Sequence, residues 1–180
     1  QGLAEFEQIK EKSKTNKGIL QVSGCMESQK SHLMYGLSGI APYRLILAED
    51  ERRAREIYED YRFYDRKVYS YPAKDLLFFQ ADIHGNLLIR HRMKVIKALL
   101  EEKELTVVTS IDGCMDFLES LEKIKEQLIH YESDSTVDTE QLKNQLVALG
   151  YERVGQVEMP GQFSVRGGIV DIYCLTEENP

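Results

Sequence analysis

The sequence is poor in the residues that build disulfide frameworks and metal sites. Its 180 residues include three cysteines and four histidines, and no C-x-x-C pair occurs among them. A disulfide framework needs an even number of cysteines and a zinc site needs clustered ligands, so we predict neither of them and no metal. Reduced thiols in a cytoplasmic protein are the expectation for Cys25, Cys114 and Cys174.

Long apolar runs and an excess of positive charge are also missing. No apolar stretch approaches the roughly 20 residues that cross a bilayer, and no basic-then-apolar leader opens the sequence. The 23 Lys and Arg residues are outnumbered by 30 Asp and Glu residues, which gives a net charge of −7. Sequence-independent binding of nucleic acid depends on neutralising phosphates with positive charge, so it is not expected of this acidic chain. Without a membrane-spanning stretch or a leader, a membrane partner is not expected either.

What is present is an alternation of strand-like and helix-like segments over residues 1–118. Strands are expected at 18–22, 43–47, 67–71 and 105–109. Helices are expected at 4–14, 28–37, 87–102 and 111–119, and another carries Ala54, Ile57, Tyr58 and Tyr61 at helical spacing. Alternation with short connections requires parallel strands joined by crossovers, with helices covering the sheet. We therefore predict an α/β parallel-sheet domain over this part of the chain.

Residues 119–180 predict a small α+β domain instead. Asp138 can cap a helix that ends at Gly150. The β-type segments that follow are 151–159, 162–166 and 169–173. The last strand would leave an open edge near the end of the sequence, and an open edge is a liability unless something pairs with it. We expect the chain to be part of a longer polypeptide, with this domain truncated at its C-terminal end.

The turn after the first expected strand resembles a phosphate-binding loop. Gly24, Lys30 and Ser31 have the spacing of the pattern G-x-x-x-x-G-K-[ST]. Gln29 replaces the second glycine, and Glu27 adds a negative charge that would repel a phosphate. We expect a degenerate loop that holds no cofactor. The alternative is a nucleotide-binding P-loop NTPase that uses Lys30 and Ser31.

Two other groups of residues are candidates for binding, and no catalytic residues are predicted because no nucleophile motif occurs. The expected helix at 87–102 is basic, which suits either a DNA-facing strip or, as the favoured reading, a solvated helix face. Its basic residues, with the one that follows it, are Arg90, Arg92, Lys94, Lys97 and Lys103. The second group lies in the α+β domain and consists of Arg153, Phe163, Arg166 and Tyr173. Arginine and aromatic residues often dominate protein interfaces, although surface arginines and core aromatics are the ordinary alternative.

A family resemblance favours the interface. Residues 149–173, from Leu149-Gly150 to Ile172-Tyr173, resemble the N-terminal region of the bacterial transcription-repair coupling factors, the Mfd family, and more distantly UvrB. The segments 48–54, 71–75 and 107–110 fall in register as well, so the resemblance covers nearly the whole chain.

The resemblance implies a RecA-like parallel-sheet half-domain without ATPase activity at 1–118, and a UvrA-binding α+β domain at 119–180. It implies UvrA contacts at Arg153 and Arg166, with Phe163 and Tyr173 nearby, whereas UvrB has a further arginine in place of Ser164. The stretch 72–86 is too short for the hairpin with which UvrB clamps DNA. In the full-length family member, ATP and Mg would bind motor domains elsewhere, and RNA polymerase and double-stranded DNA would be further partners.

Overall fold

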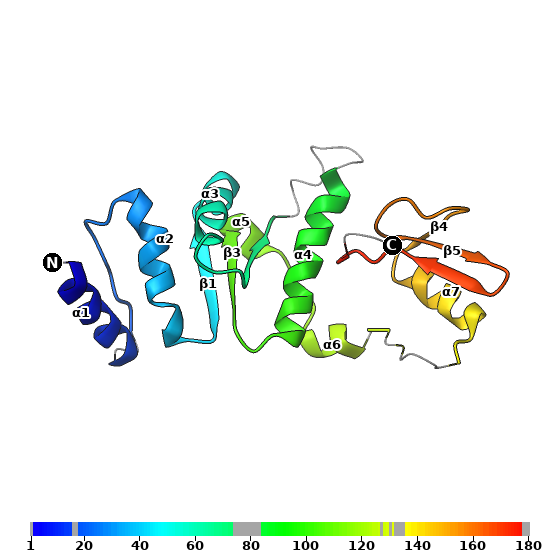
Figure 1. The fold of residues 1–180 in the computed structure, drawn as a ribbon, viewed down its shortest axis with the longest axis horizontal. Helices are drawn as coiled ribbons and strands as arrows, with labels where there is room; N and C mark the ends of the chain where they lie inside the picture. Colours follow the sequence, from blue (N-terminus) through cyan, green and yellow to red (C-terminus); the bar gives the residue numbers. More distant parts are fainter. Residues whose placement is uncertain are drawn as a thin grey trace. The chain divides into compact units, whose positions relative to one another are not determined.

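The chain forms two compact units (Figure 1), the first made of residues 1–74 and 101–116 and the second of 75–100 and 117–180. The structure is a computed structural model that describes residues 2–15, 18–73, 84–126, 128, 129, 131 and 136–177, with the backbone alone at 2, 3 and 84–87. The domain boundary predicted at residue 118 stays a prediction. Among the described helices, none has the length and apolar character needed to cross a membrane.

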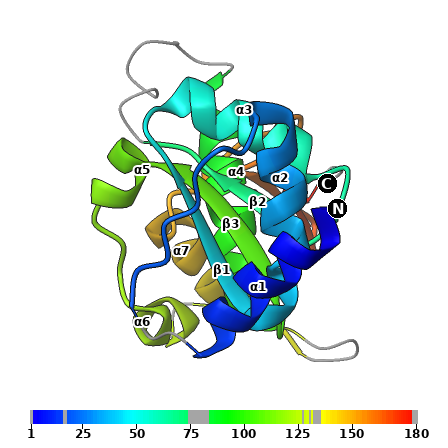
Figure 2. The same cartoon turned by 90° about the vertical axis from the view of Figure 1, so that its left-hand side faces the viewer.

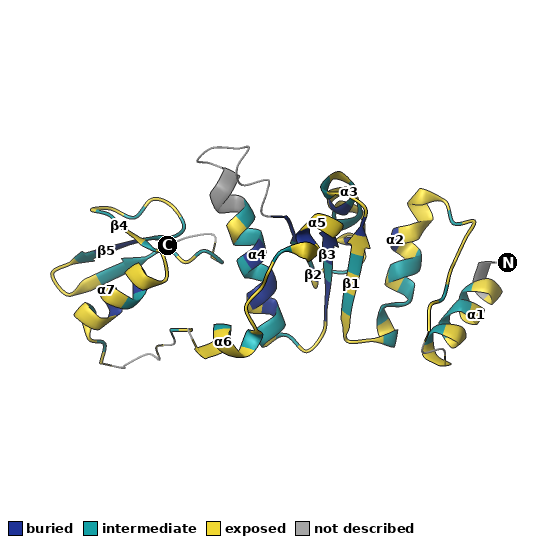
Figure 3. Cartoon of the chain, turned by 180° about the vertical axis from the view of Figure 1, so that it is seen from behind, coloured by how far each residue is buried: buried dark blue, intermediate teal, exposed yellow. Residues whose placement is uncertain are grey.

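The first unit contains a sheet of three parallel strands, as the alternating pattern predicts (Figure 2). The strands are β1 (Tyr43–Ala48), β2 (Val68–Tyr71) and β3 (Leu105–Ser110), and their order is β1-β3-β2. The central strand β3 is buried at all but one position, because it has a strand on each side and helices against its faces (Figure 3). The prediction of an α/β domain with a parallel sheet is confirmed.

Two helices of the first unit, at 51–61 and 111–115, contact this sheet directly, and the others pack outside them or on one another. The helices of this unit are α1 (Gly2–Thr15), α2 (Glu27–Gly36), the short η1 (Ser38–Ile40), α3 (Glu51–Tyr61) and α5 (Ile111–Met115). The carboxylate of Asp50 accepts a hydrogen bond of 2.7 Å from the backbone N–H of Arg53, which caps the start of α3. Ala54 and Tyr61 of α3 are buried against Val108 of β3 in one apolar cluster. The helix expected at 111–119 ends at Met115, because the next residue has an extended backbone.

A partly buried ion pair holds the start of β1 to its surroundings. Arg44 donates to the carboxylate of Asp65 at 3.3 Å, and the two side chains are 17% and 14% exposed. The same guanidinium donates to the Thr106 hydroxyl at 2.8 Å. It also donates to the backbone carbonyls of Ser38 and Ala41 at 2.8 and 2.9 Å. Arg44 therefore joins η1, β1, β3 and the turn that follows α3.

A contact between a tyrosine and a carboxylate lies near the start of β3. The hydroxyl of Tyr69 on β2 donates to the carboxylate of Glu102. Burial, and then this hydrogen bond to an anion, raise the pKa of Tyr69 to about 12. The hydroxyl therefore keeps its proton beyond the ordinary range of tyrosine.

The strand expected at 18–22 is wrong. These residues form no strand, and β1, which would be its neighbour, pairs only with β3 among the described strands. Ile19 is 96% exposed and Val22 is 42% exposed, so this segment buries neither side chain well. A β-type composition forms a strand only where a neighbour supplies hydrogen bonds and a buried face.

The second unit combines helices with a mixed three-stranded sheet. Its helices are α4 (His84–Glu101), α6 (Leu121–Glu126) and α7 (Thr139–Ala148), and its strands are β4 (Glu152–Arg153), β5 (Gln162–Arg166) and β6 (Ile169–Ile172). The sheet order is β4-β5-β6, with β4 parallel and β6 antiparallel to β5. The predicted α+β character is confirmed, whereas α6 was not expected. The β segment expected at 151–159 is reduced to two residues, because the chain then folds into a loop.

Candidate functional site

The α7 helix and one face of the small sheet form the core of the second unit. Asp138 caps α7 by accepting hydrogen bonds from the backbone N–H groups of Glu140 and Gln141 at 2.9 and 3.1 Å. Leu142 and Leu146 then project from α7 into a cluster with Phe163 of β5. This core fixes the strands that carry the predicted contact residues.

Phe163 is part of that core rather than of the surface. Its side chain is 0% exposed. A residue without exposed area can support a contact surface from beneath, but a partner cannot reach it while the unit is folded. The aromatic type of Phe163 is therefore explained by packing in the core, the ordinary alternative to an interface role.

Arg166 lies at the tip of the hairpin formed by β5 and β6. The turn is made by Gly167 and Gly168, whose φ values of 57° and 91° belong to the left-handed region that glycine enters readily. A guanidinium nitrogen of Arg166 donates to Asp171 on β6 at 3.0 Å, and these side chains are 65% and 43% exposed. Ile169, the cross-strand partner of Arg166, is 65% exposed. We call Arg166, Ile169 and Asp171 the hairpin-tip surface.

Gln162 and Ser164 lie on the same face of β5 as Arg166 and are covered by the loop between β4 and β5. The side-chain oxygen of Gln162 accepts hydrogen bonds from the backbone N–H groups of Glu158 and Met159 at 3.1 and 3.0 Å. Ser164 donates to the backbone carbonyl of Gly155 at 3.2 Å and is 1% exposed. A partner therefore cannot reach Ser164, the position at which UvrB has a further arginine.

The two predicted contact arginines do not share a face of the sheet. Arg153 is the register partner of Phe163, so it lies on the face that packs on α7, at the exposed edge formed by β4. Arg166 follows Gln162 and Ser164 at intervals of two residues and lies on the opposite face. Tyr173 is partly buried, and its backbone N–H donates to the carbonyl of Gln162 at 2.9 Å. The structure thus exposes both arginines but brings only Arg166 to the hairpin-tip surface.

The basic helix α4 uses several of its cations within the second unit. Lys97 forms an ion pair of 3.0 Å with Glu177, and this contact lowers the pKa of the Glu177 carboxyl. Arg90 donates to the backbone carbonyl of the same residue. Arg92 is only 7% exposed. These contacts leave fewer cations for a DNA-facing strip than the sequence offers.

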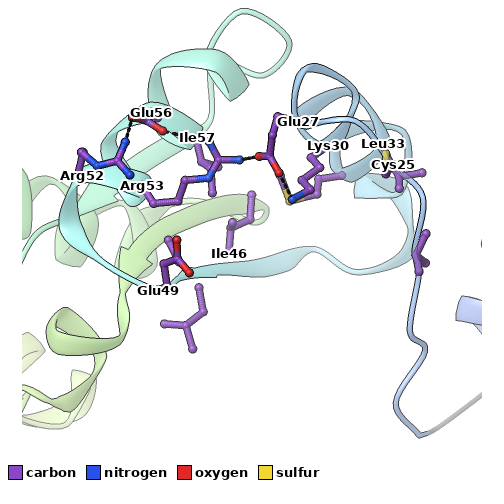
Figure 4. Close-up of a pocket in the computed structure, with 14 residues that line it drawn as sticks. Cys25, Glu27, Lys30, Leu33, Ile46, Glu49, Arg52, Arg53, Glu56 and Ile57 are labelled. Atoms are coloured by element: carbon purple, nitrogen blue, oxygen red, sulfur yellow. Dashed lines mark hydrogen bonds and ion pairs between the residues drawn. The ribbon is translucent and has the colours of Figure 1, made fainter.

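The loop before α2 borders a cavity of about 740 Å³ in the first unit (Figure 4). Lys30 and Glu27 come from the first turn of α2, and Arg53 comes from the first turn of α3. The carboxylate of Glu27 is ion-paired with both Lys30 and Arg53. Ser31 is buried, with 4% of its surface exposed. Gly24 has a φ of 81° and nothing near its Cα on the side where a Cβ would project.

Comparisons with known proteins found a family model that matches part of this chain and relatives that align with more of it. Residues 129–180, which contain the hairpin-tip surface, match the family model described as the UvrB interaction domain. In an alignment that is 174 residues long and covers 88% of this chain, the sequence is 31% identical to the transcription-repair-coupling factor of Bacillus subtilis (strain 168). The chain is related to the transcription-repair coupling factors.

Other transcription-repair coupling factors match a shorter part of the chain. That of Staphylococcus haemolyticus (strain JCSC1435) is 31% identical over 109 residues, and that of Staphylococcus aureus (strain bovine RF122 / ET3-1) is 30% identical over 112 residues. These alignments cover 61% and 62% of this chain. The chain spans 15% of the length of the Bacillus relative and 9% and 10% of the other two. The expected relationship to an N-terminal region of transcription-repair coupling factors is confirmed.

Proposed function

We propose that the second unit recruits the damage-recognition protein UvrA, and that the hairpin-tip surface is part of the docking site. The observation that carries this proposal is the match of residues 129–180 to the UvrB interaction domain, together with the exposure of Arg166 within that segment. The family resemblance supports UvrA as the partner.

The chemistry of the hairpin-tip surface suits an acidic partner with a small apolar recess. Arg166 presents a planar guanidinium that can pair with a carboxylate through two parallel hydrogen bonds. Asp171 holds that guanidinium at 3.0 Å in the free protein, which limits the orientations that it must lose on binding. Ile169 adds an exposed apolar side chain directly across the hairpin.

The position of Arg153 adds a geometric requirement to this proposal. Because Arg153 lies on the other face of the sheet, a partner that contacts both arginines must reach around the sheet. We therefore assign the main contact to Arg166 and a peripheral one to Arg153. Phe163 supports the sheet from within the core.

The parent protein of such a unit would couple stalled transcription to DNA repair. In that proposal the present chain is a non-catalytic recruitment region, and an ATP-dependent DNA translocase with its Mg²⁺ would lie in other parts of the parent. RNA polymerase and double-stranded DNA would be partners of those parts.

Calorimetric titration of the chain with UvrA tests the recruitment role. Arg166→Ala is expected to weaken binding at least tenfold, because a hydrogen-bonded charge pair buried on binding contributes on the order of 2–5 kcal/mol. Arg62→Ala is the matched control, since Arg62 makes an ion pair of the same 3.0 Å length with Glu59 and is 52% exposed in the first unit. Equal affinity of Arg166→Ala and the unaltered chain would reject the assigned surface, and absence of UvrA binding by the folded chain would reject the proposed function.

A further inference from the structure

The cavity beside the degenerate loop has the layout of an anion site. It lies where α2 and α3 both begin, and helix starts carry partial positive charge. Its charged lining consists of the cations Lys30, Arg52 and Arg53 and of an equal number of carboxylates, from Glu27, Glu49 and Glu56. Lysine and arginine at such a place are the usual partners of phosphate groups.

A carboxylate from the chain already occupies these cations. One oxygen of Glu27 contacts the Lys30 ammonium, and the other contacts the guanidinium of Arg53, as the dashed lines of Figure 4 show. A second guanidinium nitrogen of Arg53 forms an ion pair with the carboxylate of Glu56 at 3.0 Å. Glu56 in turn contacts Arg52 at 2.5 Å. Cations and carboxylates thus alternate along the rim of the cavity.

A backbone N–H group of the loop also donates its hydrogen bond to a side chain of the same chain. The oxygen of the Gln29 amide accepts a hydrogen bond of 3.4 Å from the backbone N–H of Met26. In a phosphate-binding loop such N–H groups point at phosphate oxygens. Gln29 stands where the phosphate-loop pattern has its second glycine. The substitution therefore supplies an acceptor from the chain itself.

We propose that Lys30 and Arg53 form an anion site whose ligand is the carboxylate of Glu27, and that removing this carboxylate lets the site bind a polyphosphate group. Glu27 is a substitute for the ligand and not only a repulsive charge. It bridges α2 and α3 through the same two kinds of cation that would hold a diphosphate. The unaltered chain accordingly holds no polyphosphate here.

The variant Glu27→Gln tests this proposal because it keeps the size of the side chain and removes its charge. Glu27 is 63% exposed, so the substitution is compatible with the fold, and circular dichroism verifies it. Binding of sodium pyrophosphate is measured by calorimetry at low ionic strength. We expect Glu27→Gln to bind pyrophosphate at least tenfold more tightly than the unaltered chain does. Adding Lys30→Ala to the variant should abolish the gain.

The control is Glu56→Gln, which removes the other carboxylate on Arg53 and changes the net charge by the same amount. If Glu56→Gln gains as much affinity as Glu27→Gln, the effect is one of general charge and the proposal is wrong. It is equally wrong if Glu27→Gln gains nothing, or if the unaltered chain already binds pyrophosphate as tightly. Glu27→Ser serves as a second variant should the glutamine form aggregate.

Discussion

Replacing Phe163 separates a structural role from a role in contact. The side chain is 0% exposed and packs with Leu142 and Leu146, so its truncation leaves a cavity in the core of the second unit. Phe163→Ala should cost about 3–5 kcal/mol of unfolding free energy. Phe163→Leu keeps an apolar side chain of similar size and should cost less than about 1.5 kcal/mol.

These two costs predict different effects on UvrA binding. Domains are stable by about 5–15 kcal/mol, so Phe163→Leu stays almost wholly folded and its affinity for UvrA should stay within about twofold. If the unfolding free energy is at the low end of this range, about 5 kcal/mol, Phe163→Ala leaves a measurable fraction of the chain unfolded. The apparent affinity for UvrA then falls in proportion to the folded fraction.

The assay pairs urea unfolding, followed by circular dichroism, with calorimetric titration of UvrA. Affinity corrected for the folded fraction should be the same for both Phe163 variants and the unaltered chain. A loss of more than about fivefold in Phe163→Leu, with the fold intact, would show that the ring reaches the partner. Burial would then be a poor guide to this site.

Two further predictions concern the first unit. Arg44→Met should lower its unfolding free energy by about 1–3 kcal/mol in urea titrations, because it leaves the partly buried carboxylate of Asp65 without its cation. Arg52→Met, with a side chain 73% exposed, should change it by less than about 1 kcal/mol, and similar effects of both would refute this reasoning. The pKa of Tyr69 is raised to about 12, so the folded state holds this proton more strongly, and the associated stability should be present below about pH 10 and lost as the pH rises toward 12. In phenolate absorbance titrations, Tyr69→Phe should remove one late-titrating group, and an unchanged titration curve would contradict the Glu102 contact.

Local signals in the sequence predicted much of the fold. The capping carboxylate Asp138 marks the start of α7, and apolar residues at helical spacing place the buried face of α3. Such signals act within a few residues, so they are readable without knowledge of the rest of the chain. The segment 18–22 shows the limit, because its composition could not reveal that no strand would pair with it.

The candidate sites depend more on contacts between distant residues. Arg153 and Arg166 are of similar type in sequence, yet the register of β4 on β5 places them on opposite faces. Phe163 has the residue type of an interface but the environment of a core. Glu27 was expected to repel an anion, and its contact with Arg53, 26 residues away, was not visible from the loop pattern.

The ion pairs of Glu27 also bear on what the first unit needs in order to stay folded. A site filled from solution stabilises a protein by an amount that rises and falls with ligand concentration. A carboxylate attached to α2 has a fixed effective concentration near Arg53, however dilute the surroundings are. Under the proposal that Glu27 fills this anion site, the link between α2 and α3 does not depend on a dissolved ligand, and the unfolding free energy of the unaltered chain should not change when pyrophosphate is added.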